Sequence, residues 1–152
     1  MIAPYGDGGT ALMLRMTPYK NTNFTDAEAK VTLGMIIEEQ GQKVNKFYTL
    51  DLELSKINSL TLSWTLVHPI TEDSPLYQFT AADFQSIDGE ILVFVKTFDE
   101  MFSTTVAAST SYTFEEFVYG AKFEMMYSDS EDDSRTILHL DKLNSFYAVD
   151  LK

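Results

Sequence analysis

Apolar and polar residues alternate along most of this chain with a period of two, as they do in β-strands that have one buried face. The run over residues 60–66 shows the pattern clearly and contains the single tryptophan, Trp64. We expect this strand to end near His68, because Pro69 cannot donate to a sheet ladder. The same pattern predicts further strands over residues 11–16, 27–39, 44–54, 90–98, 101–112, 121–127, 136–140 and 146–149.

Turn and capping residues separate these strands. Gly and Asp predict a turn over residues 5–9, since both tolerate the positive φ of tight turns. A short helix is predicted over residues 80–87, where Thr80 can cap the first turn. The capping-box spacing from Thr113 to Glu116 predicts a second helical turn.

Many short strands, short turns and little helix predict an all-β fold, an antiparallel β-sandwich with one or two short helices. The chain has 152 residues, of which 45% are hydrophobic. That length supports one sizeable core, so we expect a single domain over residues 1–152.

Charge and composition then narrow the classes of partner. The chain has 23 acidic and 11 basic residues, a net charge of -12. Such a surface repels phosphate backbones and anionic lipids and attracts cations, so we expect no nucleic acid partner. Solubility is the simpler explanation of the acidity. There is no cysteine and no apolar run approaching the roughly 18 residues of a membrane helix, so we expect a soluble chain in a reducing cytoplasm.

No catalytic or metal site is predicted. His68 and His139 lie on different predicted strands, and structural or surface roles are expected for both. The acidic residues 129–133 resemble the start of a calcium loop, but Ser134 stands where that loop needs Gly and Leu140 where it needs Glu. A solvated hairpin tip is the better interpretation. We therefore expect neither an enzyme nor a bound cofactor.

Four stretches of the chain carry a family resemblance. Residues 12–15 read LMLR, residues 63–70 SWTLVHPI, residues 74–77 SPLY and residues 110–123 TSYTFEEFVYGAKF. They resemble LMFR, SWTVMHPI, SPLY and TSYxxxEIxWGxRF in the cytoplasmic C-terminal domain of inward-rectifier potassium channels, including prokaryotic members. The similarity keeps one order from near the first residue to near the last.

The resemblance implies an immunoglobulin-like β-sandwich of the E-set type that assembles as a homotetrameric ring below a two-helix transmembrane pore. The axis of the ring continues the path of potassium ions, and contacts between subunits couple to the gate. Because the pore helices are absent from this chain, we expect it to be the cytoplasmic part, at the membrane's inner face, of a longer channel. An acidic ring would concentrate potassium, which gives the net charge a purpose beyond solubility.

Pore-lining candidates follow from the resemblance. Asp26 stands where many members have a pore-facing Glu, although it could equally be a turn residue that leads into a strand. Lys96 stands where eukaryotic members often have an acidic pore-facing residue, which weakens the case for a second acidic ring. Glu100 is close in sequence and could compensate.

The family motifs also supply candidates for subunit contacts or gating: Arg15, Glu72, Asp73, Tyr77, Glu116 and Lys122. The chain departs from the family pattern at several positions, with Ser109 in place of Arg, Tyr119 in place of Trp and Lys122 in place of Arg. Pro18, Lys20 and Asn21 replace residues of a basic segment. Phosphoinositide binding, which uses that segment, is therefore not expected to transfer.

A second class of function stays open at this point. The chain could be a free-standing immunoglobulin-like module that binds a protein partner through an exposed edge strand or through its loops.

Overall fold

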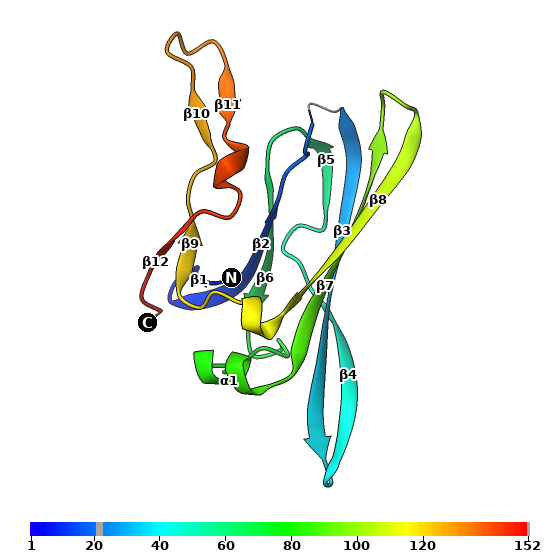
Figure 1. The fold of residues 1–152 in the computed structure, drawn as a ribbon, viewed down its shortest axis with the longest axis vertical. Coiled ribbons are helices and arrows are strands. Elements are labelled where there is room, and N and C mark those ends of the chain that lie inside the picture. The colour runs from blue at the N-terminus through cyan, green and yellow to red at the C-terminus, as the bar shows by residue number, and fades with distance from the viewer. Residues whose placement is uncertain (21–22, 152) are drawn as a thin grey trace.

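The computed structural model describes residues 1–20 and 23–151 and consists mainly of antiparallel strands (Figure 1). A three-stranded sheet has the order β1-β2-β6 and contains β1 (Ile2–Tyr5), β2 (Gly9–Met16) and β6 (Trp64–Ile70). The larger sheet has the order β4-β3-β7-β8, with β5 also paired to β3. Its strands are β3 (Phe24–Glu39), β4 (Gln42–Leu50), β5 (Lys56–Leu60), β7 (Gly89–Asp99) and β8 (Thr104–Thr113).

Short elements complete the chain. Two small sheets pair β9 (Ala121–Phe123) with β12 (Phe146–Ala148) and β10 (Tyr127–Asp129) with β11 (Thr136–Leu138). The helical pieces are α1 (Ala81–Ser86) and the 3-10 turns η1 (Phe114–Glu116) and η2 (Leu140–Lys142). The β10–β11 hairpin projects away from the two main sheets (Figure 1). The prediction of an all-β antiparallel sandwich is confirmed.

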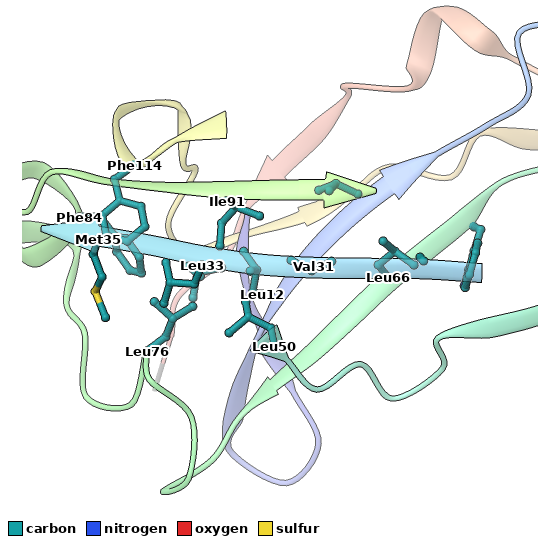
Figure 2. Close-up of a cluster of buried hydrophobic side chains, with 14 of the residues drawn as sticks. Leu12, Val31, Leu33, Met35, Leu50, Leu66, Leu76, Phe84, Ile91 and Phe114 are labelled. Carbon is teal, nitrogen blue, oxygen red and sulfur yellow. The ribbon is translucent and has the colours of Figure 1, made fainter. Parts of the chain in front are cut away.

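The core lies between the two main sheets. Leu12 and Leu66 come from the smaller sheet, Leu33 and Ile91 from the larger one, and all four are fully buried (Figure 2). Burial of a side chain of this size stabilises a fold by about 1.5–3 kcal/mol. The period of two therefore has the expected cause in β3, β6 and β7, since alternate residues of these strands fill one shared core.

Aromatic rings close one end of the core, next to the two predicted helical segments. The Phe84 ring of α1 lies 5.1 Å from the Phe114 ring of η1, and Phe117 lies 5.2 Å from both. Both predicted helices are confirmed. In each, a carboxylate three residues after the cap accepts the cap's amide hydrogen, at 2.7 Å for Asp83 and 2.8 Å for Glu116.

Three of the predicted strand ranges are wrong. The predicted strand over residues 121–127 is two strands in different sheets, β9 and β10, with residues 124–126 between them. The predicted strand over residues 44–54 ends at Leu50, and residues 51–55 are irregular because the chain turns there from β4 toward β5. The alternation over residues 60–66 belongs to two strands in different sheets, with the turn at residues 61–63 between them. A period of two indicates an extended chain with one apolar side, and it does not show where the chain changes sheets.

His68 has the structural role expected of it. Its ring is buried, with Nδ1 2.7 Å from the Asp51 carbonyl oxygen and Nε2 2.8 Å from Ser74 Oγ. A carbonyl oxygen only accepts, so Nδ1 donates to it. Ser74 Oγ accepts the Leu76 amide hydrogen at 3.1 Å, which leaves its own hydrogen for Nε2. The ring thus ties β6 to the segment after β4 and to the SPLY loop.

Gly120 provides a stability prediction. Its φ is +71°, and a Cβ there would lie 2.8 Å from the Val149 carbonyl oxygen. We expect Gly120→Ala to lower the free energy of unfolding by about 2 kcal/mol, through backbone strain and this contact. The matched control is Gly41→Ala, where φ is +77° and no atom lies within 4 Å, and which should cost about 1 kcal/mol. Equal losses in urea unfolding would contradict the role of Val149.

Candidate functional site

The start of β3 and the β7–β8 turn lie at the same end of the larger sheet, the upper end in Figure 1, and both carry charged residues. The antiparallel register places Phe24 opposite Asp99 and Glu28 opposite Lys96. The start of β3 therefore lies beside the end of β7 and the β7–β8 turn. This arrangement brings together all three pore-lining candidates named from the sequence: Asp26, Lys96 and Glu100.

Asp26 lies in a β-bulge. The register between β3 and β7 shifts between Thr25 and Glu28, so that two residues of β3 oppose Thr97 alone. Asp26 has φ of +50° and an exposed side chain. Asp is among the few residues that enter this left-handed region readily. The bulge changes the direction of the strand and directs the carboxylate into solvent, away from the ladder.

Glu100 is held at the first position of the β7–β8 turn. Its amide donates to the Asn23 carbonyl oxygen at 3.1 Å, and Asn23 Nδ2 donates to Glu100 Oε2 at 2.5 Å. The preceding Asp99 is buried and accepts the Met101 amide hydrogen at 2.9 Å. These bonds fix the turn against the start of β3, so Glu100 and Asp26 stay at the same end of the sheet.

Lys96 is paired with a residue that the sequence did not single out. Its Nζ lies 3.1 Å from Glu28 Oε2, and Lys56 Nζ lies 3.9 Å from Glu28 Oε1. All three side chains project from the outer face of the sheet. Glu28 brings one negative charge against the two positive charges of Lys96 and Lys56, so it reduces the repulsion of a cation near this face without removing it. Glu28 lies two residues after Asp26 on the same strand, and this spacing was the available signal in the sequence for its place beside the pore-lining candidates.

The ion pair leads to a pH prediction. The hydrogen bond from Lys96, aided by the charge of Lys56, holds the pKa of Glu28 below its usual range. The stability that this pair contributes is complete above the pKa of Glu28 in the unfolded chain and is lost as the pH falls through the lower folded value. Carboxyl NMR titration should show the pKa of Glu28 rising in Lys96→Met. An unchanged pKa of Glu28 in that variant would contradict the pairing.

Arg15 binds the C-terminal part of its own chain. Its Nε donates to the Leu143 carbonyl oxygen at 3.1 Å, and Nη2 donates to the Lys142 carbonyl oxygen at 2.6 Å. Nη1 donates to the Glu124 carbonyl oxygen, and the guanidinium carbon lies 4.2 Å from the centre of the Phe123 ring. Arg15 thus clamps β2 to residues 123–145 of the same chain, a role that sequence reasoning missed.

The remaining contact candidates are spread over the surface. Glu72 and Asp73 are exposed in the turn after β6, and Tyr77 is 41% exposed in the SPLY loop. Glu116 caps η1, and Lys122 is exposed in β9 opposite Tyr147. The structure does not bring these residues to one place. The prediction for Asn21 lies outside the described residues.

The acidic residues 129–133 form the tip of the β10–β11 hairpin, as predicted. Asp132 Oδ1 accepts hydrogen bonds from the hydroxyls of Ser130 and Ser134 at 2.6 and 2.7 Å, which lower the pKa of Asp132 to about 2. Within residues 1–20 and 23–151, no three His, Asp or Glu side chains are arranged so that they could hold a metal ion. None of the helices in that part of the chain has the length and apolar character needed to cross a membrane.

Comparisons with known proteins all point to the same family. The model of the "Inward rectifier potassium channel C-terminal domain" matches residues 2–152. The chain is 27% identical over 132 residues to the inward rectifier potassium channel Kirbac3.1 of Paramagnetospirillum magnetotacticum, which covers 86% of this chain and 45% of that protein. It is 29% identical over 124 residues to the ATP-sensitive inward rectifier potassium channel 12 of Gallus gallus, covering 78% of this chain and 29% of that channel.

A third relative is the inward rectifier potassium channel irk-1 of Caenorhabditis elegans, 24% identical over 149 residues, covering 94% of this chain and 27% of that channel. The chain thus spans less than half the length of each of these relatives. The names are those of ion channels and not of enzymes. With residues 2–152 matched, the chain belongs to the family of inward rectifier potassium channel C-terminal domains.

Proposed function

We propose that four copies of this chain form a ring at the cytoplasmic end of a potassium channel and extend its ion path. The observation that carries the proposal is the family match over residues 2–152. In this ring the outer face of the larger sheet, at the end that holds Asp26 and Glu100, is turned toward the axis. Potassium ions pass this end, and movements between neighbouring copies couple to the gate.

The charges at this end support an electrostatic role. Asp26 is exposed and Glu100 lies at the adjacent turn, while Glu28 is shared by Lys96 and Lys56. A ring of carboxylates raises the local concentration of cations and so the rate at which they enter a pore. Screening limits this effect to about 8 Å at physiological ionic strength, so it requires side chains that line the path closely.

The coding sequence ahead of residue 1 tests the proposal most directly. We expect it to encode two membrane-spanning helices and a filter of the T-x-G-Y-G type. A reading frame without any pore helix would overturn the channel assignment. Solution scattering of the chain at rising concentration is the second test, with a four-fold particle expected and face-to-face pairs alone as the contrary result.

A free-standing protein-binding module is the second candidate. The observation that favours it is the long exposed edge of β8 in the larger sheet, because such an edge can accept a strand from a partner. A reading frame that encodes this domain without a pore would support that alternative.

A further inference from the structure

A group of lysines lies on the outer face of the larger sheet, in a chain that has 23 acidic and only 11 basic residues. Lys56 of β5 and Lys96 of β7 flank Glu28 of β3, with their Nζ atoms 3.9 Å and 3.1 Å from its carboxylate oxygens. Lys30, two residues after Glu28 on β3, is exposed on the same face. We call Glu28 and these three lysines the lysine cluster.

Glu28 does not balance the charge of the lysine cluster. Three ammonium groups against one carboxylate leave two positive charges, and among the described residues Glu28 is the only acid within ion-pair distance of these lysines. The Glu28 side chain is 23% exposed, whereas those of Lys96 and Lys56 are 52% and 72% exposed. The hydrogen bond from Lys96 and the charges of Lys56 and Lys30 all lower the pKa of Glu28, so the three charges act near one place and face solvent.

The row of residues beside the cluster contains no acid. Lys30 lies opposite Phe94 of β7, which is 43% exposed, and Phe94 lies opposite the exposed Ser109 of β8. The carboxylates of Asp26 and Glu100 belong to the other side of the cluster, toward the β7–β8 turn. An anion can therefore reach the lysines from the side of Phe94 without approaching those carboxylates, and Ser109 offers it a hydroxyl donor.

The spacing of the ammonium groups selects an anion with several charges. Lys56 and Lys96 belong to the two strands beside Glu28, and neighbouring strands lie about 4.8 Å apart. Lys30 is one two-residue repeat, about 7 Å, further along β3. A chain of linked phosphates can span all three lysines, whereas a single phosphate meets fewer of them. Lysine binds phosphate as a point charge, and its bonds to phosphate oxygens are stronger than those between neutral groups.

We propose that the lysine cluster binds a soluble anion that carries two or more linked phosphate groups. The phosphates lie between Lys30, Lys56 and Lys96, and Ser109 donates its hydroxyl hydrogen at the edge of the site. The site is complete within one copy of the chain. Its consequence for ion flow rests on the proposed ring: where four copies surround the axis, the bound anion outweighs the positive charge of each cluster and favours cations at that level of the path.

Calorimetric titration of the 152-residue chain with inorganic tripolyphosphate tests the site. We expect saturable binding of one tripolyphosphate per chain at low ionic strength, and binding of orthophosphate that is at least about tenfold weaker, because orthophosphate meets fewer ammonium groups. The affinity should fall as salt is added, since screening weakens contacts between exposed charges. Amide NMR shifts should be largest near Lys30 and Lys96. The absence of saturable binding at low ionic strength would overturn the proposal.

Matched substitutions separate the site from the net charge of the chain. Lys30→Gln and Lys56→Gln should each weaken tripolyphosphate binding by about threefold to fivefold, whereas Lys43→Gln, at an exposed lysine of β4, should leave it unchanged. Glu28→Gln should strengthen binding, because it removes the competing carboxylate. Glu131→Gln makes the same change in charge at the β10–β11 tip and should have no effect. Circular dichroism checks that the variants fold, and equal effects of cluster and control substitutions would contradict the site.

Light scattering of the same samples distinguishes this site from the proposed ring. Tripolyphosphate binding by a chain that stays monomeric at every concentration would support the site and count against the ring. A tetramer that binds no tripolyphosphate would overturn the site and leave the ring intact.

Discussion

Arg15→Met should release the C-terminal part of the chain from the sandwich. The substitution removes the donors of the hydrogen bonds to the Leu143, Lys142 and Glu124 carbonyl oxygens, and it also removes the stacking on Phe123. Carbonyl oxygens that lose their charged hydrogen-bond donors in a partly buried site raise the free energy of the folded state. We expect the free energy of local opening of residues 121–148 to fall by about 3 kcal/mol, measured by hydrogen exchange of the β9 and β12 amides.

Arg15→Lys is the matched variant that keeps the charge. A lysine ammonium cannot reproduce the planar fork that reaches several carbonyl oxygens at once, so we expect most of the loss to remain. Exchange in β7 should change little in either variant, because β7 lies in the other sheet. Full protection of β9 and β12 in Arg15→Met would show that the clamp contributes nothing.

Asp26→Lys should reduce the potassium conductance of the proposed channel by about threefold to tenfold at low ionic strength. The change reverses one charge in every copy of the proposed ring, and the bulge keeps that side chain in solvent. The reduction should become smaller as salt increases, because screening shortens the reach of each charge. Single-channel recording at several salt concentrations measures both effects.

Asp7→Lys is the control for this experiment. Asp7 is exposed in the β1–β2 turn, so the substitution makes the same change in net charge at a different place. We expect the conductance to stay near the original value. Equal reductions from both substitutions would mean that net charge matters and position does not, which would contradict an axial location for Asp26.

The elements of the fold were largely predictable because the alternation of residues reports burial directly. β2, β3, β7 and β8 lie close to the predicted ranges, and the β10–β11 hairpin has its acidic tip where expected. The predictions failed over residues 51–54, 60–66 and 121–127, where the apolar pattern continues although the chain leaves one strand for another. Leu54 and Leu62 fit the alternation and are nevertheless exposed, because the chain there leaves one strand for the next.

The candidate site was predictable in part. Asp26, Lys96 and Glu100 were named from a resemblance, and the register of β3 and β7 brings them to one end of the sheet. Glu28 was missed because its pairing with Lys96 depends on a bulge that shifts the register by one residue, and no local pattern marks that shift. The clamp role of Arg15 was missed because its acceptors are carbonyl groups, which every residue carries.

The first strand, β1, is bonded to residues 118–120, far along the chain, and this affects the order in which the protein can form during synthesis. The Ile2 amide donates to the Val118 carbonyl oxygen at 2.8 Å, and the Gly120 amide donates to the Ile2 carbonyl oxygen at 2.9 Å. A ribosome releases the first strand long before these partners exist, and contacts across such long separations form slowly. Until residues 118–145 emerge, β1 and Arg15 lack their final partners. Nascent chains arrested before that point should therefore remain sensitive to protease at the N-terminal strand.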